Sequence, residues 1–466
     1  MRFRRLALFA LIAATLAPAA PAAAARATAV PSVFAVAGDH APGTPLRYDR
    51  VMVRRYGSAS AKKVVVLVPG TLAGAADFSL VGPYLAAHVP GLQVWAEMRR
   101  EGALEDNSML LEGLHNQATV QQVFDYYLGW SVNPSISPHY QPLDSTKFAF
   151  ADGWGLAVAM NDLHAVILKA RAGGRHTVVL GGHSLGGSEA SIYPAWDFGG
   201  HAGYEDIAGI VAIDGLALRP GAGISTAPQA RAELTKLKGS KSGPWSGLLS
   251  PLPAWSTGAF AEVGALAALK APHAPSVAQS SHLIPPLLRP PFPATNAGQL
   301  GYAYDTVASK PSNGLALIDV HSGHLATSGA VRDWVNSGPT PIQNVARAFS
   351  TEPLGPVDWY YPTRLSIDVQ AADPLTETAA AHVLGLRLSH ADQVNVPLYA
   401  IQTSLGGAGN AVANGARAYK RISRIPSVTI VDRSKSYGHL DPLLAAPGNN
   451  AFLQTVIPWL ERIRVR

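Results

Sequence analysis

The sequence contains no cysteine, which excludes disulfides, thiolate catalysis and cysteine-ligated metals. Charge is also scarce, because charged residues make up 15% of the chain and hydrophobic residues 48%. Basic residues cluster no further than pairs such as Arg54-Arg55 and Arg99-Arg100, so the charge pattern does not favour nucleic acid binding. This composition is typical of a globular protein whose stability depends on a sizeable core.

Long apolar runs are absent except near the N-terminus. There Arg2, Arg4 and Arg5 precede the apolar run 6–17, and an Ala/Pro stretch follows. These three regions are typical of a secretory signal peptide, so residues 1–25 are set apart from the fold and the protein is expected to be secreted or extracytoplasmic. An uncleaved membrane anchor is the alternative, although the run is too short to span a bilayer. Removing this segment lowers the formal charge from +6 to +3.

Elsewhere no stretch approaches 18 apolar residues without a charge, so no stable membrane insertion is expected after signal removal. Strand and helix patterns alternate along the first half of the chain instead. The expected strands and helices, in chain order, are 48–56, 63–68, 78–88, 92–96, 110–129, 156–170, 177–181 and 207–213. This alternation predicts an α/β fold with a mostly parallel sheet flanked by helices.

The alternation stops after Asp214-Gly215 and resumes near residue 396. Seven prolines lie between Pro272 and Pro293, within a stretch rich in Ala and Leu. We interpret residues 216–392 as a large cap, or lid, inserted over the carboxyl edge of the sheet. A separate domain unrelated to the site is the alternative. The sheet is then formed by residues 26–215 and 393–466.

The second of these segments completes the alternating pattern. Its expected elements are a strand over 396–402, a helix over 410–422, a strand over 428–432 and a terminal helix over 450–461. Parallel strands deliver their carboxyl ends to one edge of a sheet, so loops far apart in sequence can meet there.

The sequence Gly182-His183-Ser184-Leu185-Gly186 follows a buried strand and precedes a helix pattern. Such a sharp turn projects one serine hydroxyl, and its glycines allow a backbone crossing too close for a Cβ. A Gly-rich loop with an incidental serine is the alternative. A catalytic serine would need a neighbouring base.

His439 is the best placed of the 15 histidines, because it follows the last strand in a glycine-containing loop. His183 is adjacent to Ser184, but its side chain is expected to point away from that of Ser184. For the pair His321 and His324, no carboxylate or cysteine completes a metal-ligand set at short spacing, so we interpret the pair as structural. No metal or organic cofactor is expected.

Residues 64–70, residues 182–187, the insertion and Gly438-His439 occur in the order and spacing of the α/β-hydrolase superfamily. The chain most resembles its secreted esterases and lipases. The resemblance extends from about Tyr48 to the end, except for the insertion. It implies the α/β-hydrolase fold and is specific for the superfamily, although weak for the substrate.

By this resemblance Ser184 is the nucleophile and His439 the base. The amides of Leu185 and Thr71 are the implied oxyanion donors. Leu72 remains an alternative to Thr71, because a Pro-Gly pair stands where many members have His-Gly.

The third catalytic residue departs from the usual pattern. Superfamily members usually carry the acid after the strand that is expected here at 396–402, but residues 403–426 contain no Asp or Glu. Asp214, at the end of the strand after the serine turn, occupies a position that some lipases use instead. It is our choice for the acid that orients His439, with Asp432 and Asp441 as alternatives.

Together these features predict a secreted serine hydrolase that cleaves lipophilic carboxylic esters through an acyl-enzyme. The expected partner is a small-molecule or lipid ester, and no nucleic acid. A secreted acyltransferase with the same acyl-enzyme is the nearest rival. A non-catalytic binder of apolar ligands on this fold is the rival from another class.

Overall fold

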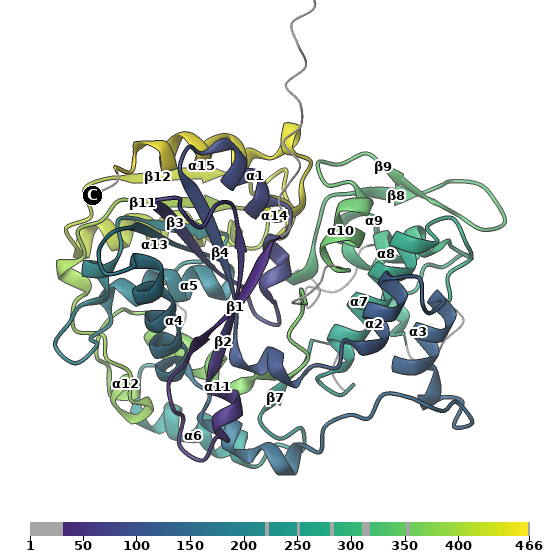
Figure 1. Ribbon diagram of the computed structural model, residues 1–466, viewed down its shortest axis with the longest axis horizontal. Coiled ribbons are helices and arrows are strands. Elements are labelled where there is room, and N and C mark those ends of the chain that lie inside the picture. Colours follow the sequence, from purple (N-terminus) through teal and green to yellow (C-terminus); the bar gives the residue numbers. More distant parts are fainter. Residues whose placement is uncertain are drawn as a thin grey trace, which may run out of the picture.

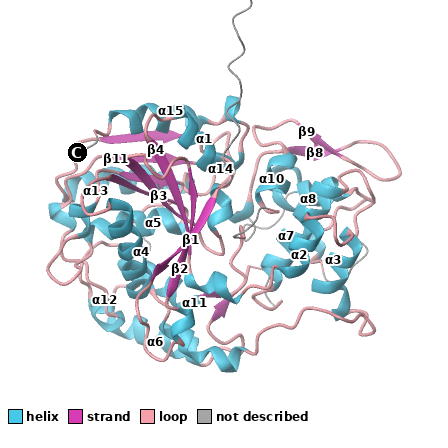
Figure 2. Cartoon of the chain, viewed as in Figure 1, coloured by secondary structure: helices cyan, strands magenta, loops and turns pink. Residues whose placement is uncertain are grey.

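A central sheet of eight strands organises the molecule (Figures 1 and 2). The computed structural model describes residues 31–219, 223–248, 252–279, 284–309, 317–350 and 355–464, so residues 1–25 lie outside it. The strands, in spatial order, are β1 (Ser32–Ala37), β2 (Arg50–Tyr56), β4 (Leu92–Met98), β3 (Lys63–Val68), β5 (Thr177–His183), β6 (Ile210–Ile213), β11 (Leu398–Gln402) and β12 (Val428–Asp432).

Only β2 runs antiparallel to its neighbours in this sheet, so the predicted mostly parallel sheet is confirmed. β1 lies before the first strand expected from the sequence, at 48–56, and was not predicted. It pairs with β2 from Ser32 opposite Arg55 to Ala37 opposite Arg50.

Helices cover both faces of the sheet because its central strands are buried on both sides. In β3, Val64, Val66 and Val68 belong to one apolar cluster, whereas Val65 and Leu67 belong to another. This alternation follows from the two-residue repeat of a strand. The first face is covered by α4 (Leu156–Arg171), α5 (Leu185–Ile192) and α13 (Ala411–Ile422), and the second by α1 (Val81–His88) and α15 (Ala451–Arg462). On the side of the first face, α6 (Ala227–Lys238), α11 (Thr363–Ala372) and α12 (Ala379–Leu384) form a further layer, in which α11 packs against α4 and α5.

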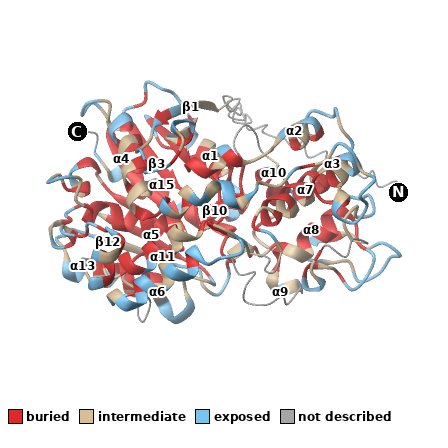
Figure 3. Cartoon of the chain, turned by 90° about the horizontal axis from the view of Figure 1, so that it is seen from below, coloured by how far each residue is buried: buried red, intermediate tan, exposed pale blue. Residues whose placement is uncertain are grey.

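A second lobe, which we define as residues 108–127, 256–279, 284–309 and 317–348, lies beside the sheet on the right of Figure 1. Much of its helical backbone belongs to buried residues (Figure 3). It contains α2 (Ser108–Leu114), α3 (Val120–Tyr127), α7 (Ser256–Lys270), α8 (Asn296–Tyr304), α9 (Thr306–Ser309), β8 (Gly323–Leu325), β9 (Trp334–Asn336) and α10 (Ile342–Ala348).

The second lobe does not coincide with the insertion expected at 216–392. From that insertion α6, α11 and α12 pack instead over the helices of the first face, where Leu237, Leu365 and Leu384 join the same apolar cluster. Conversely, α2 and α3 precede the serine turn in sequence but pack against α7. An amphipathic helix pattern shows that a face is buried, but not which of two bodies buries it.

The single helix expected over residues 110–129 is also divided. α2 ends at Leu114, and α3 begins after Thr119. The Thr119 side chain accepts a hydrogen bond from the Gln122 amide, and the Gln122 side chain caps Thr119 in return. This capping box is the sequence signal for a new helix start.

A buried carboxyl joins α7 to the chain that leaves the second lobe. Trp359 donates its indole N–H to Glu262 Oε2 at 3.0 Å, and both side chains are buried. Burial raises the pKa of Glu262 to about 8, so this group is protonated in the folded protein at neutral pH.

Glu262 therefore makes stability depend on pH. Between about pH 4.5 and 8 the unfolded chain has lost this proton while the folded chain keeps it, so rising pH lowers the free energy of unfolding by up to about 1.4 kcal/mol per pH unit. Glu262→Gln removes this contribution and is expected to flatten the pH dependence. Urea denaturation from pH 5 to 9 measures the slope, with Glu233→Gln on exposed α6 as the control that leaves it unchanged.

Candidate active site

Ser184 stands at a sharp turn between β5 and α5. Its backbone has φ +54° and ψ −120°, a strained conformation for a residue with a side chain. The turn is possible because glycines flank it. A Cβ on Gly182 would lie 2.1 Å from the Gly186 carbonyl oxygen, and a Cβ on Gly186 would lie 2.1 Å from that of Val68. The strand-to-helix turn thus holds the Ser184 side chain at the carboxyl edge of the sheet.

Asp214 and His439 meet at the same edge. The His439 Nδ1–H donates to Asp214 Oδ2 at 2.5 Å, and both side chains are buried. A carboxylate only accepts, so this bond places the ring proton on Nδ1 and leaves Nε2 free to accept a proton. Sequence positions 214 and 439 are thereby joined although 225 residues separate them.

The loop after β11 supplies donors for Asp214 instead of an acid. The Thr403 amide donates to Oδ1 at 2.5 Å, the Thr403 hydroxyl donates to Oδ2, and the Gly406 amide lies 3.1 Å from Oδ1. Burial acts to raise the pKa of Asp214, but the hydrogen bonds from His439 and Thr403 more than offset it and hold that pKa below its ordinary value. Asp214 is therefore a carboxylate at neutral pH.

The two alternative acids lie elsewhere. Asp441 Oδ2 accepts from the Gly438 amide at 2.7 Å, and Asp441 Oδ1 accepts from the Thr340 hydroxyl at 2.5 Å. Burial raises the pKa of Asp441 to about 7. Asp432 is exposed and binds Ser434. Asp441 thus shapes the loop that carries His439, whereas Asp432 forms a surface turn.

The loop after β3 faces the serine turn. Leu72 adopts φ +58°, and its carbonyl accepts from the Asp358 amide at 3.1 Å. Neither the Thr71 nor the Leu72 amide donates a hydrogen bond within the described ranges. Leu185 is the first residue of α5, so its amide lies at the helix end where N–H groups are unpaired.

Arg99 holds this loop in place. Its guanidinium donates to the Pro69 carbonyl at 2.6 Å and to the Gly70 carbonyl at 3.1 Å. The same group lies 3.3 Å from Glu189 of α5 and 3.7 Å from Asp358. Arg99 is buried, and its contacts connect the loop after β3 to the helix that follows Ser184. Its role was not predicted from sequence.

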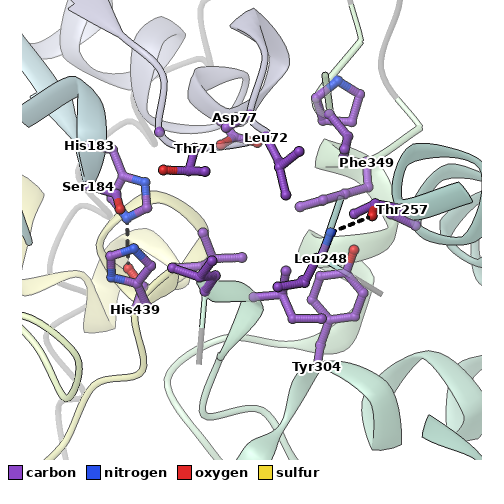
Figure 4. Close-up of a pocket in the computed structure, with 18 residues that line it drawn as sticks. Thr71, Leu72, Asp77, His183, Ser184, Leu248, Thr257, Tyr304, Phe349 and His439 are labelled. Atoms are coloured by element: carbon purple, nitrogen blue, oxygen red, sulfur yellow. Dashed lines mark hydrogen bonds between the residues drawn. The ribbon is translucent and has the colours of Figure 1, made fainter. Parts of the chain in front are cut away.

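Ser184 and His439 line one cavity of about 500 Å³ with Thr71, Leu72 and His183 (Figure 4). The Nε2 atom of His439 is buried and has no hydrogen-bond partner among the described residues, Ser184 included. Catalytic hydrogen bonds often form only when substrate binds, so the free Nε2 is compatible with a role as base toward Ser184.

His183 lies against His439, which the sequence did not indicate. Its Nε2–H donates to the His439 carbonyl at 2.9 Å, and the two rings are 4.4 Å apart between centroids. Burial lowers the pKa of His183 to about 3, with a further contribution from His439, so the ring is neutral. His183 therefore fixes the loop of His439 without adding a positive charge beside it.

Asp77 also lines the cavity, from the short helical turn Ala75–Phe78. Its Oδ1 atom is buried without a partner among the described residues. Burial raises the pKa of Asp77 well above its ordinary value, so burial disfavours the charged carboxylate in this cavity.

The histidine pair of the second lobe has local partners. The His321 amide donates to Asp441 Oδ1 at 3.1 Å, and its Nδ1–H donates to the Ser436 carbonyl at 3.0 Å. His324 lies in β8. Across the described ranges, no three His, Asp or Glu side chains form a group that could hold a metal ion. No helix in the same ranges is long and apolar enough to cross a membrane.

Comparison with known proteins finds similar folds but no similar sequence. No family model matches, and no curated protein matches. A candidate lipase from Sulfolobus solfataricus is 15% identical, with a TM-score of 0.47 over 93% of this chain and 94% of that one. An epoxide hydrolase from an endophytic Streptomyces is 12% identical, with a TM-score of 0.42 over 93% and 96%. A monoglyceride lipase of Saccharomyces cerevisiae is 10% identical, with a TM-score of 0.40 over 93% and 95%.

The glycine contacts at the serine turn predict a large loss of stability for Gly182→Ala. The added Cβ would meet the Gly186 backbone at 2.1 Å, so strand and helix must separate, at a cost of about 3 kcal/mol or more. Urea denaturation measures this cost. Gly448→Ala is the control, because nothing lies within 4 Å of a Cβ there. Equal stability of the two variants would contradict the close crossing.

Proposed function

The chain has the α/β-hydrolase fold, and on that premise we propose that it is a serine hydrolase that cleaves carboxylic esters through an acyl-enzyme. Ser184 attacks the ester carbonyl, His439 Nε2 takes the serine proton and then gives it to the leaving alcohol, and Asp214 holds the His439 ring in the required tautomer. Water then releases the acyl group by the same steps. The N-terminal pattern of residues 1–25 supports export of this enzyme.

The observation that carries the proposal is the 2.5 Å hydrogen bond between Asp214 and His439 beside a strained serine turn. A buried carboxylate stabilises the positive charge that forms on His439 when it accepts the serine proton. The hydrogen bonds from Thr403 keep Asp214 ionised for this role. A structural aspartate would not need a histidine that lines a cavity with Ser184 and whose other nitrogen has no hydrogen-bond partner among the described residues.

The proposed oxyanion donors are the amides of Leu185 and Thr71, with Leu72 as the alternative to Thr71. These amides stand on the helix after Ser184 and on the loop that Arg99 clamps. Preorganised donors of this kind stabilise the negative oxygen of the tetrahedral intermediate. The clamp from Arg99 to the Pro69 and Gly70 carbonyls supports such preorganisation.

A lipophilic, uncharged ester fits the cavity best. Its lining includes Leu248, Ala261, Ile318 and Phe349. The His183 ring is neutral at neutral pH, and burial raises the pKa of Asp77 well above its ordinary value. A charged substrate would lose its hydrating water on entering the cavity, and these apolar walls would not compensate for that loss. An epoxide hydrolase reaction is not proposed, because that chemistry uses an aspartate where Ser184 stands.

Ser184→Ala is expected to lower kcat for p-nitrophenyl butyrate on the order of a million-fold, because no nucleophile remains. The fold should persist, since an alanine fits wherever the serine does. Circular dichroism checks the fold. Hydrolysis by this variant at the wild-type rate would exclude Ser184 as the nucleophile, and an added alcohol acceptor distinguishes hydrolysis from acyl transfer by the product formed.

Asp214→Asn is expected to lower kcat by about ten-thousand-fold, because an amide can donate to Nδ1 and favour the wrong tautomer of His439. Asp432→Asn is the matched control on an exposed turn and is expected to stay within about twofold of the wild type. Steady-state kinetics on one ester compares the two variants. If Asp432→Asn lost more activity than Asp214→Asn, the acid would have to be reassigned.

A further inference from the structure

A second cavity of about 680 Å³ lies in the second lobe beside the catalytic cavity. Its walls come mainly from α7, α8 and the chain before α8. Apolar side chains dominate them, among them Phe260, Val263, Ile284, Leu288, Leu300 and Ile318. Small-molecule sites likewise have walls that are mostly apolar.

The two cavities adjoin. Both are lined by Leu248, Thr257, Ala261, Tyr304 and Ile318, so at most one layer of side chains separates them. Figure 4 places Leu248, Thr257 and Tyr304 across the catalytic cavity from His439. An ester carbonyl bound at Ser184 would therefore have the second, apolar cavity on its side toward the second lobe.

The polar groups of the second cavity are few, and two are held by protein contacts. The Thr257 hydroxyl accepts from the Leu248 amide at 3.0 Å, and the Gln299 side-chain amide donates to the Leu288 carbonyl at 2.6 Å. None of the described residues that line this cavity carries a charge. The walls thus match a hydrocarbon chain, which needs no hydrogen bonds and gains free energy by leaving water.

We propose that this cavity binds the acyl chain of the substrate and that the substrate is an ester of a medium- or long-chain straight acyl group. The proposal rests on the proposed function, because it needs the acyl carbon at Ser184. Of the two parts of an ester, the acyl group stays on the enzyme through both steps, whereas the alcohol must leave. An enclosed apolar site suits the part that stays.

Gly264 offers a way to fill the cavity. It lies on α7 and lines the wall, and a Cβ there would meet only Leu300 Cδ1, at 3.7 Å. Gly264→Phe therefore places a ring in the cavity without a backbone clash. Ala303→Phe, on α8, fills the same cavity from another wall and provides a second variant should the first fail to fold.

The experiment compares kcat/KM for p-nitrophenyl esters of butyrate and palmitate. In the wild type each added methylene that enters the cavity should raise kcat/KM by about fourfold, so excluding about four of them lowers the palmitate-to-butyrate ratio about two-hundredfold. Gly448→Phe is the control, because it adds the same ring at a surface position with nothing within 4 Å of its Cβ and should leave the ratio unchanged.

A second series varies the alcohol of acetate esters. Preference for long alcohols with no preference among acyl chains would overturn the assignment of the cavity to the acyl group. An unchanged palmitate-to-butyrate ratio in folded Gly264→Phe and Ala303→Phe would also overturn it.

Binding separates this proposal from the proposed function. A fluorescent fatty acid, 11-(dansylamino)undecanoic acid, is titrated into Ser184→Ala and into Ser184→Ala with Gly264→Phe. Binding to the first that weakens at least tenfold in the second supports the cavity even if the enzyme assignment fails. Equal binding to both contradicts the cavity even if ester hydrolysis is established.

Discussion

The crossing of backbones at the serine turn is the constraint on which the rest of the site depends. Gly182, Gly186 and the end of β3 approach so closely that no Cβ fits between them. This contact fixes α5 against the sheet and forces Ser184 to φ +54°. The same close approach brings the loop after β3 beside the serine, since a Cβ on Gly70 would lie 3.1 Å from Ser184 Cβ. Backbone strain of this kind persists only where the surrounding structure determines it.

Hydrogen bonds to two buried charged groups, Asp214 and Arg99, then hold the segments of the site that do not take part in the backbone crossing. Asp214 is held by Thr403, Gly406 and His439, and Gly406 is needed because a Cβ there would lie 2.2 Å from Asp214 Oδ1. Arg99 binds the carbonyls before Thr71 and reaches Glu189 on α5. Both networks join segments far apart in sequence. In the first, Nε2 of His439 has no hydrogen-bond partner among the described residues, and in the second the Thr71 and Leu72 amides donate no hydrogen bond within the described ranges.

Much of the sheet could be predicted from sequence because its strands are continuous β-branched runs, as in residues 63–68, and a Gly-rich turn follows one of them. Because no acid follows β11 in sequence, the sequence favoured Asp214, whose Oδ2 lies 2.5 Å from His439 Nδ1 in the structure. The contact of His183 with His439 could not be predicted, because it depends on how a loop 256 residues away folds back. Arg99 belongs to no recognisable motif. The division of the helices between the sheet and the second lobe depends on their packing partners, which amphipathic patterns do not identify.

The central claim is that Ser184, His439 and Asp214 act together on an acyl carbon. The most direct measurement is the site and rate of modification by a fluorophosphonate, followed by peptide mass spectrometry of the native protein and of His439→Ala. The account predicts a single adduct on Ser184 in the native protein and strongly slowed labelling in the variant, because a serine hydroxyl needs the base to react. An adduct on another residue, or equal labelling rates in the two proteins, would contradict it.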